Sequence, residues 1–195
     1  MKGRTNDARI AEWVRNAQDG DQEAFARLVE ALAPRVYALA MRYLGHAMEA
    51  EDVVQETFLR AYANLWTVDP KRPFWPWLAT IAIRLCIDHL RRRRKAVALE
   101  DLTYMGAWMA SHEPTPEEAA LSEERIRRIR HLVLQLPPRE RAVVVLHYWE
   151  GMDLRTVAEV LGWSTSAVKS LLYRARKHIE QAWNREERLP RSTEA

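Results

Sequence analysis

The feature that most constrains this chain is the spacing of its apolar residues, which is helical almost everywhere. Over residues 21–45, apolar side chains recur every three or four positions, the pattern of half-buried helices. The same spacing returns over the ranges 49–66, 77–94, 121–136 and 138–149. Only six of the 195 residues are glycine, and runs of β-branched residues are few. The sequence therefore predicts an all-α protein.

Proline residues predict where these helices are interrupted. Pro34 lies inside an apolar pattern, so we expect two helices with a break near residues 33–35. Three prolines within residues 67–76 predict a stiff, extended loop before the next helix. That next helix, 77–94, is apolar on two sides and is predicted to be the central helix of a bundle.

Composition divides the chain into two helical units. The first ends in a run of cations at 91–95, and residues 113–124 then carry five acids and no base. We therefore expect two small helical domains, at 8–95 and 122–185, joined by a flexible acidic linker at 96–121.

Several functions are disfavoured by what the sequence contains. The single cysteine, Cys86, excludes a disulfide framework or a multi-cysteine zinc site. The net charge of +3 does not by itself prove a nucleic-acid partner, because the positions of the charges matter more than their sum. No signal-peptide pattern or apolar run of membrane-spanning length occurs, which favours a cytoplasmic protein without membrane insertion. We find no phosphate-binding loop, zinc motif or catalytic triad, and so expect neither an enzyme nor a cofactor.

The segment 152–183 predicts a helix-turn-helix. Asp153 and Ser164 are suited to cap two successive helices, and Gly162 between them is suited to end the first in a left-handed turn. In the second helix, four residues form the buried stripe: Val168, Leu172, Ala175 and Ile179. The opposite face carries small polar groups and cations: Ser166, Lys169, Ser170, Tyr173, Arg174, Arg176 and Lys177. Such a face suits base edges and phosphates in the major groove, although a helical hairpin with a solvated basic face fits the same pattern.

Two other clusters allow more than one interpretation. The cations Lys71 and Arg72 are followed closely by Phe74, Trp75 and Trp77, an arrangement that can bind single-stranded bases, although Phe74 and Trp77 also suit a core. Acids and His46 open the predicted helix at 49–66. Their spacing does not suit a metal site, so they either stabilise the helix start or dock a basic partner.

Taken together, these segments resemble bacterial RNA polymerase sigma factors of the extracytoplasmic-function (ECF) class, in the sigma-70 family. The matching segments are DQEAF at 21–25, AEDVVQETF at 50–58, FWPWLATIA at 74–82 with Asp88, LPPRER at 136–141, and the helix-turn-helix. The resemblance covers about residues 10 to 185.

The resemblance implies roles that spacing alone does not supply. It implies binding to core RNA polymerase, at the clamp helices of the largest subunit and the flap of the second-largest, with the clamp helices contacted through Asp52, Gln55, Glu56 and Leu59. It implies recognition and melting of the promoter −10 element by Lys71, Arg72, Phe74, Trp75, Arg84, Asp88, Arg91 and Arg92. The −35 element would be read by Thr165, Ser166, Lys169, Ser170, Tyr173, Arg174, Arg176 and Lys177. An anti-sigma factor would hold such a protein inactive.

Two positions depart from the family pattern. Arg84 stands where Asn is frequent near the flipped base, so the −10 preference is expected to differ. Leu171 stands where many members have a cation, which would remove one phosphate contact. The alternatives to a sigma factor are a stand-alone helix-turn-helix regulator that binds an operator as a dimer, and a helical protein-interaction adaptor.

Overall fold

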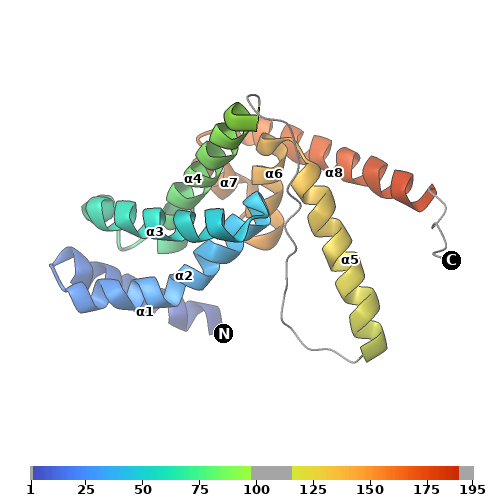
Figure 1. Ribbon diagram of the computed structural model, residues 1–195. Coiled ribbons are helices and arrows are strands. Elements are labelled where there is room, and N and C mark those ends of the chain that lie inside the picture. Colours follow the sequence, from blue (N-terminus) through green and yellow to red (C-terminus); the bar gives the residue numbers. More distant parts are fainter. Residues whose placement is uncertain (1, 98–115, 189–195) are drawn as a thin grey trace.

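The structure, a computed structural model, describes residues 2–97 and 116–188, and within them the side chains of 7–93 and 124–185. These ranges consist of helices joined by short loops and form two units (Figure 1). The first unit comprises α1 (Lys2–Gln18), α2 (Gln22–Leu44), α3 (Ala47–Asn64), the 3₁₀ turn η1 (Leu65–Thr67) and α4 (Phe74–Val97). The second comprises α5 (Pro116–Gln135), α6 (Pro138–Val144), the π-helical turn η2 (Val145–Trp149), α7 (Leu154–Leu161) and α8 (Thr165–Arg188). Most of the predicted linker lies outside the described residues.

Helix α4 is the central element, as its two apolar sides predicted. It contacts α1, α2 and α3 on one side and α6 and α7 on the other (Figure 1). Its buried residues include Leu78, Ala79, Ala82, Ile83, Leu85, Cys86 and Leu90. Burial raises the pKa of the Cys86 thiol, so this cysteine is a packed core residue.

The predicted break at Pro34 is wrong, because α2 runs unbroken from Gln22 to Leu44. A proline inside a helix costs about 3 kcal/mol. On either side of it, Leu28, Leu32, Val36 and Leu39 are all buried in one core. Each such side chain contributes about 1.5–3 kcal/mol, so continuous packing outweighs the lost hydrogen bond.

Two helix starts also differ from the predictions. Helix α4 begins at Phe74 rather than at residue 77, since Pro76 falls in its first turn, where a missing N–H costs nothing. Helix α5 begins at Pro116, five residues before the predicted start. On α3, Tyr62 is exposed and packs edge-on against Phe25.

The predicted helix-turn-helix is confirmed in its local details. The Asp153 carboxylate accepts hydrogen bonds from the backbone N–H groups of Arg155, at 2.9 Å, and Thr156, at 2.8 Å. These bonds hold the pKa of Asp153 below its usual value, and the bond from Thr156 has the largest effect. Gly162 adopts φ 68°, and the Ser164 hydroxyl accepts from the N–H of Ala167 at 3.2 Å. Each cap satisfies backbone groups that a helix end would otherwise leave unpaired.

The two units pack directly against each other. Tyr43 of α2 donates its hydroxyl to the carbonyl of Pro138 at 3.1 Å, and Arg141 of α6 donates to the Tyr43 carbonyl at 2.7 Å. The Leu134 side chain lies against Gly45, so close that a β-carbon at residue 45 would come within 2.9 Å of it. The chain thus folds with its second unit seated on α2 and α4.

Candidate nucleic-acid and protein-binding surfaces

Helix α8 presents the polar face that its apolar stripe predicted. Val168, Leu172 and Ala175 are buried and Ile179 is half-buried, which fixes the opposite face toward solvent. All eight residues predicted to read the −35 element are exposed: Thr165, Ser166, Lys169, Ser170, Tyr173, Arg174, Arg176 and Lys177. Leu171 is buried, so it packs in the core and is not part of the exposed face.

Two cations on this face are held by tyrosines. The Lys177 ammonium lies 5.0 Å from the centre of the Tyr173 ring, and its hydrogen bond with Tyr173 is the main cause that raises the pKa of Lys177. Arg176 donates its Nε–H to the Tyr148 hydroxyl at 2.7 Å. Because Arg176 is held in this way, its guanidinium is partly pre-ordered for a phosphate or a base.

Tyr148 is a surface residue that sequence reasoning missed. It belongs to η2, outside the helix-turn-helix, and 53% of its surface is exposed beside α8. Its only sequence signal is an aromatic residue on the polar side of a predicted helix, which is too common to single out.

The proline-rich loop between η1 and α4 is shaped by local hydrogen bonds. The Asp69 carboxylate accepts from the N–H of Lys71 at 2.9 Å, and the side chain of Gln18 donates to the carbonyls of Leu65 and Val68. These bonds fix both ends of the turn that precedes the two exposed cations, Lys71 and Arg72. The loop is therefore preformed rather than ordered only on binding.

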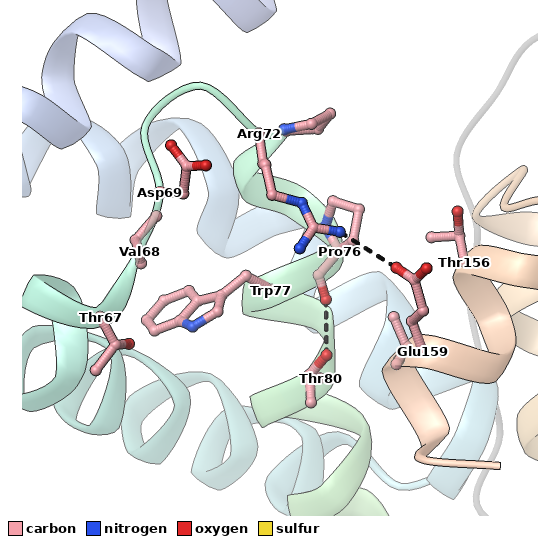
Figure 2. A pocket seen from close by; sticks show the side chains of 11 residues that line it. Thr67, Val68, Asp69, Arg72, Pro76, Trp77, Thr80, Thr156 and Glu159 are labelled. Atoms are coloured by element: carbon pink, nitrogen blue, oxygen red, sulfur yellow. Dashed lines mark hydrogen bonds and ion pairs between the residues drawn. The ribbon is translucent and has the colours of Figure 1, made fainter.

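A cavity of about 340 Å³ lies beneath this loop. One wall comes from the loop and the start of α4, including Arg72, Trp77 and Thr80, and the other from Thr156, Glu159 and Val160 of α7. Figure 2 shows Arg72 reaching across the cavity mouth toward Glu159, where their side chains form an ion pair at 3.3 Å. The cavity is thus shared between the two units.

The residues predicted to contact −10 DNA separate into exposed and buried groups. Lys71, Arg72, Arg84, Arg91 and Arg92 are exposed, and Asp88 is half-buried. Phe74 and Trp75 are buried, with the Arg35 guanidinium 3.9 Å above the Trp75 ring. Both rings pack in the core from the first turn of α4.

Helix α3 carries an exposed groove beside its acidic residues. Asp52, Gln55 and Leu59 are exposed, and Glu56 pairs with Arg60 at 2.7 Å along the same helix. The groove, of about 640 Å³, is lined by Gln22, Phe25, Gln55, Phe58, Leu59 and Tyr62. Leu59 and Tyr62 are 67% and 56% exposed, so two large apolar side chains lie together at the groove, which suits a partner surface.

His46 caps α3. Its Nδ1 accepts weakly from the N–H of Glu49 at 3.5 Å, in agreement with the helix-start interpretation. Among the described residues, no three His, Cys, Asp or Glu side chains are grouped as a metal ion would require.

Family models match both units of the chain. The model for sigma-70 region 2 matches residues 28–96, and that for sigma-70 region 4 matches residues 126–179. The ECF RNA polymerase sigma factor SigW of Bacillus subtilis is 34% identical over 179 residues, covering 88% of this chain and 95% of SigW. The chain belongs to the sigma-70 family, in its ECF class. It is a transcription initiation factor that directs RNA polymerase to promoters.

Other sigma factors agree in sequence and fold. The sigma factor CnrH of Cupriavidus metallidurans is 34% identical over 169 residues, covering 84% of this chain and 88% of CnrH. The solved structure of CnrH in complex with the cytosolic domain of CnrY matches 90% of this chain and 97% of CnrH, with a TM-score of 0.65 and 26% identity. The sigma factor RpoE of Bartonella quintana, at 20% identity and a TM-score of 0.67, has the same fold.

The sigma factor's surfaces can now be named by region. The α3 groove and the proline-rich loop belong to region 2, and the α8 face belongs to region 4. From here on, region 2 denotes α1–α4 and region 4 denotes α5–α8. Within the described ranges, no helix is long and apolar enough to cross a membrane.

Proposed function

We propose that three surfaces of this sigma factor divide the work of promoter recognition. The groove of α3 binds core polymerase, the proline-rich loop with α4 recognises and melts the −10 element, and the α8 face reads the −35 element. The functional units are domains at residues 8–95 and 122–185, and the acidic segment 96–121 links them along the RNA path of the polymerase.

The α3 groove suits a basic, amphipathic helix of the polymerase clamp. Leu59 and Tyr62 offer an apolar surface, and on the same helix Glu56 lies about one turn before Leu59 and Asp52 about two turns before it. An apolar floor with an acidic border is how a groove binds an amphipathic helix with cations at its edge. Gln55, which lines the groove, supplies a hydrogen-bonding group between the two.

The proline-rich loop suits an unpaired base flanked by phosphates. Lys71 and Arg72 are exposed on the loop, and Arg84, Arg91 and Arg92 follow along α4. A preformed loop reduces the ordering cost of holding a base outside the duplex, while the cations bind the strand. Arg84, in place of the frequent Asn, changes the groups offered to that base.

Two protein contacts beyond the clamp are part of the proposal. Region 4 binds the flap of the second-largest polymerase subunit. An anti-sigma factor holds the protein inactive, because the 26% identical CnrH was solved in complex with CnrY. The protein acts in the cytoplasm, where polymerase and DNA are, and it uses no cofactor and catalyses no reaction of its own.

The observation that carries this proposal is the exposed α8 face in a chain that matches both sigma regions. Run-off transcription from a library of genomic promoters, with and without core polymerase, tests it. We expect specific transcripts only when both proteins are present. Tight operator binding by the protein alone, with no effect on transcription by the polymerase, would favour the stand-alone regulator instead.

A further inference from the structure

Region 4 carries a buried carboxylate whose charge is balanced by region 2. Glu150 directly follows η2, and only 2% of its side chain is exposed. Its Oε2 lies 3.1 Å from Nε of Arg35, and its Oε1 lies 3.0 Å from Nη1 of Arg42. Both arginines are on α2, so this charge is compensated across the contact between the regions. A carboxylate removed from water is stable only when it is paired in this way.

The surroundings of Glu150 make the pairing dependent on close contact between the regions. Arg35 stacks on the buried ring of Trp75, which holds its guanidinium in place. Nearby, Arg141 of region 4 is buried and donates to the carbonyl of Tyr43. If the regions separated, Glu150 would return to water, and this set of contacts would be lost together.

The same contact places region 4 against the proline-rich loop. Arg72 is paired with Glu159 of α7, and α7 forms one wall of the cavity beneath the loop (Figure 2). The pair is exposed, at 72% for Arg72 and 51% for Glu159, so it contributes little to holding the regions together. The Arg72–Glu159 pair instead affects DNA binding, because the Glu159 carboxylate neutralises Arg72 and repels a DNA phosphate.

This closed arrangement is incompatible with a promoter complex. At about 3.4 Å per base pair, elements centred near −10 and −35 are roughly 80 Å apart along B-form DNA. In the closed chain, the loop and the helix-turn-helix are in direct contact through Arg72 and Glu159. The two reading surfaces must therefore separate before both elements are bound.

We propose that region 4 is a built-in inhibitor of region 2, held in place by the pairing of Glu150 with Arg35 and Arg42. In the free chain, this latch keeps α7 against the proline-rich loop, where Glu159 pairs with Arg72 and weakens the attraction of the loop for DNA. Binding to core polymerase opens the latch by holding the regions apart. The inference rests on the proposed −10 role of the loop.

Small-angle X-ray scattering of the full-length chain tests the latch. Glu150→Gln keeps the size of the side chain and removes its charge, and should shift the ratio of open to closed chains at least about tenfold toward open. The matched control is Glu23→Gln, which removes the same charge from an exposed pair with Arg27 within α2. The control should scatter like the wild type.

A second variant removes the two arginines of region 2 that pair with Glu150. Arg35→Gln with Arg42→Gln leaves Glu150 buried without its cations and should expand the chain at least as much, with helix content unchanged by circular dichroism. This variant keeps the test decisive if Glu150→Gln does not fold. A wild-type chain that is already extended, or folded latch variants that stay compact, would overturn the proposal.

Binding of fluorescein-labelled single-stranded DNA of random sequence tests the inhibition. Free Glu150→Gln protein should bind this probe more tightly than the wild type, and adding Arg72→Ala should remove the gain. A gain that survives Arg72→Ala would show that the loop is not the inhibited surface. Transcription by wild-type holoenzyme separates the two proposals: its absence would refute the proposed function, whereas normal transcription with a latch variant that stays closed would refute only the latch.

Discussion

Replacing two lysines on the exposed face of α8 should have different consequences. Lys169 lies in the second turn of α8, and Lys177 follows eight residues later. At about 1.5 Å per residue, this places Lys177 about 12 Å farther along the helix axis. A recognition helix meets base edges near its start, so Lys169 should contact bases while Lys177 lies over the phosphate backbone.

The expected losses follow from these positions. Lys169→Ala should cost about 1–3 kcal/mol at a matched −35 element, or roughly 5- to 150-fold in affinity, and much less at a scrambled one. Lys177→Ala should weaken both sequences equally and reduce the salt dependence of log K by about 0.9. Because its contact with Tyr173 raises the pKa of Lys177, this lysine stays charged throughout the neutral pH range, and its effect is that of one full cation.

Holoenzyme affinity for matched and scrambled −35 sequences, measured across a salt series, distinguishes the two lysines. The matched sequence is first selected from a random library by the wild-type holoenzyme. Lys169→Arg keeps the charge and serves as the control, with unchanged affinity for the scrambled sequence. Equal losses on both sequences for Lys169→Ala would refute base reading by α8 and leave the helix as an electrostatic surface.

Three further predictions concern region 2. Asp52→Ala with Gln55→Ala should weaken binding to core polymerase in a pull-down without loss of helix content; wild-type affinity would exclude the α3 groove as the docking surface. Replacing residues 68–73 by a Gly/Ser segment should leave polymerase binding intact but suppress open-complex formation; normal permanganate reactivity of −10 thymines would contradict this. Burial raises the pKa of Cys86 above its unfolded value of about 8.5, so the folded chain retains a proton that the unfolded chain loses. The free energy of unfolding should therefore fall above pH about 8.5, by up to about 1.4 kcal/mol per pH unit more than in Cys86→Ala, and equal pH slopes in urea titrations would argue against it.

The local elements of region 4 could be predicted because their causes are local. The bonds made by Asp153 and Ser164 join groups no more than three residues apart, and Gly162 adopts a backbone conformation that other residues avoid. The exposed face of α8 could also be predicted, since a stripe of buried residues determines the direction of every other side chain on a helix.

At two places in region 2, packing overrides local preference. Pro34 favours a helix break, but α2 stays continuous because the residues on both sides of the proline share one core. Phe74 and Trp75 have the composition of a DNA-binding loop, yet α4 starts early and takes both rings into the core. A single sequence does not state how much area each side chain will bury, and this area decides both outcomes.

The sequence by itself therefore determined the helices, their caps, the two units and the face of α8, all of which depend on spacing within a few residues. Only the tertiary structure decided how the units meet. Glu150 reaches partners 108 and 115 residues away, and nothing in its neighbourhood along the chain distinguishes it from a solvated helix end. A helical pattern tells whether a side chain is turned inward or outward, but the identity of its partner depends on how distant helices approach, which is set by the packing of the whole chain.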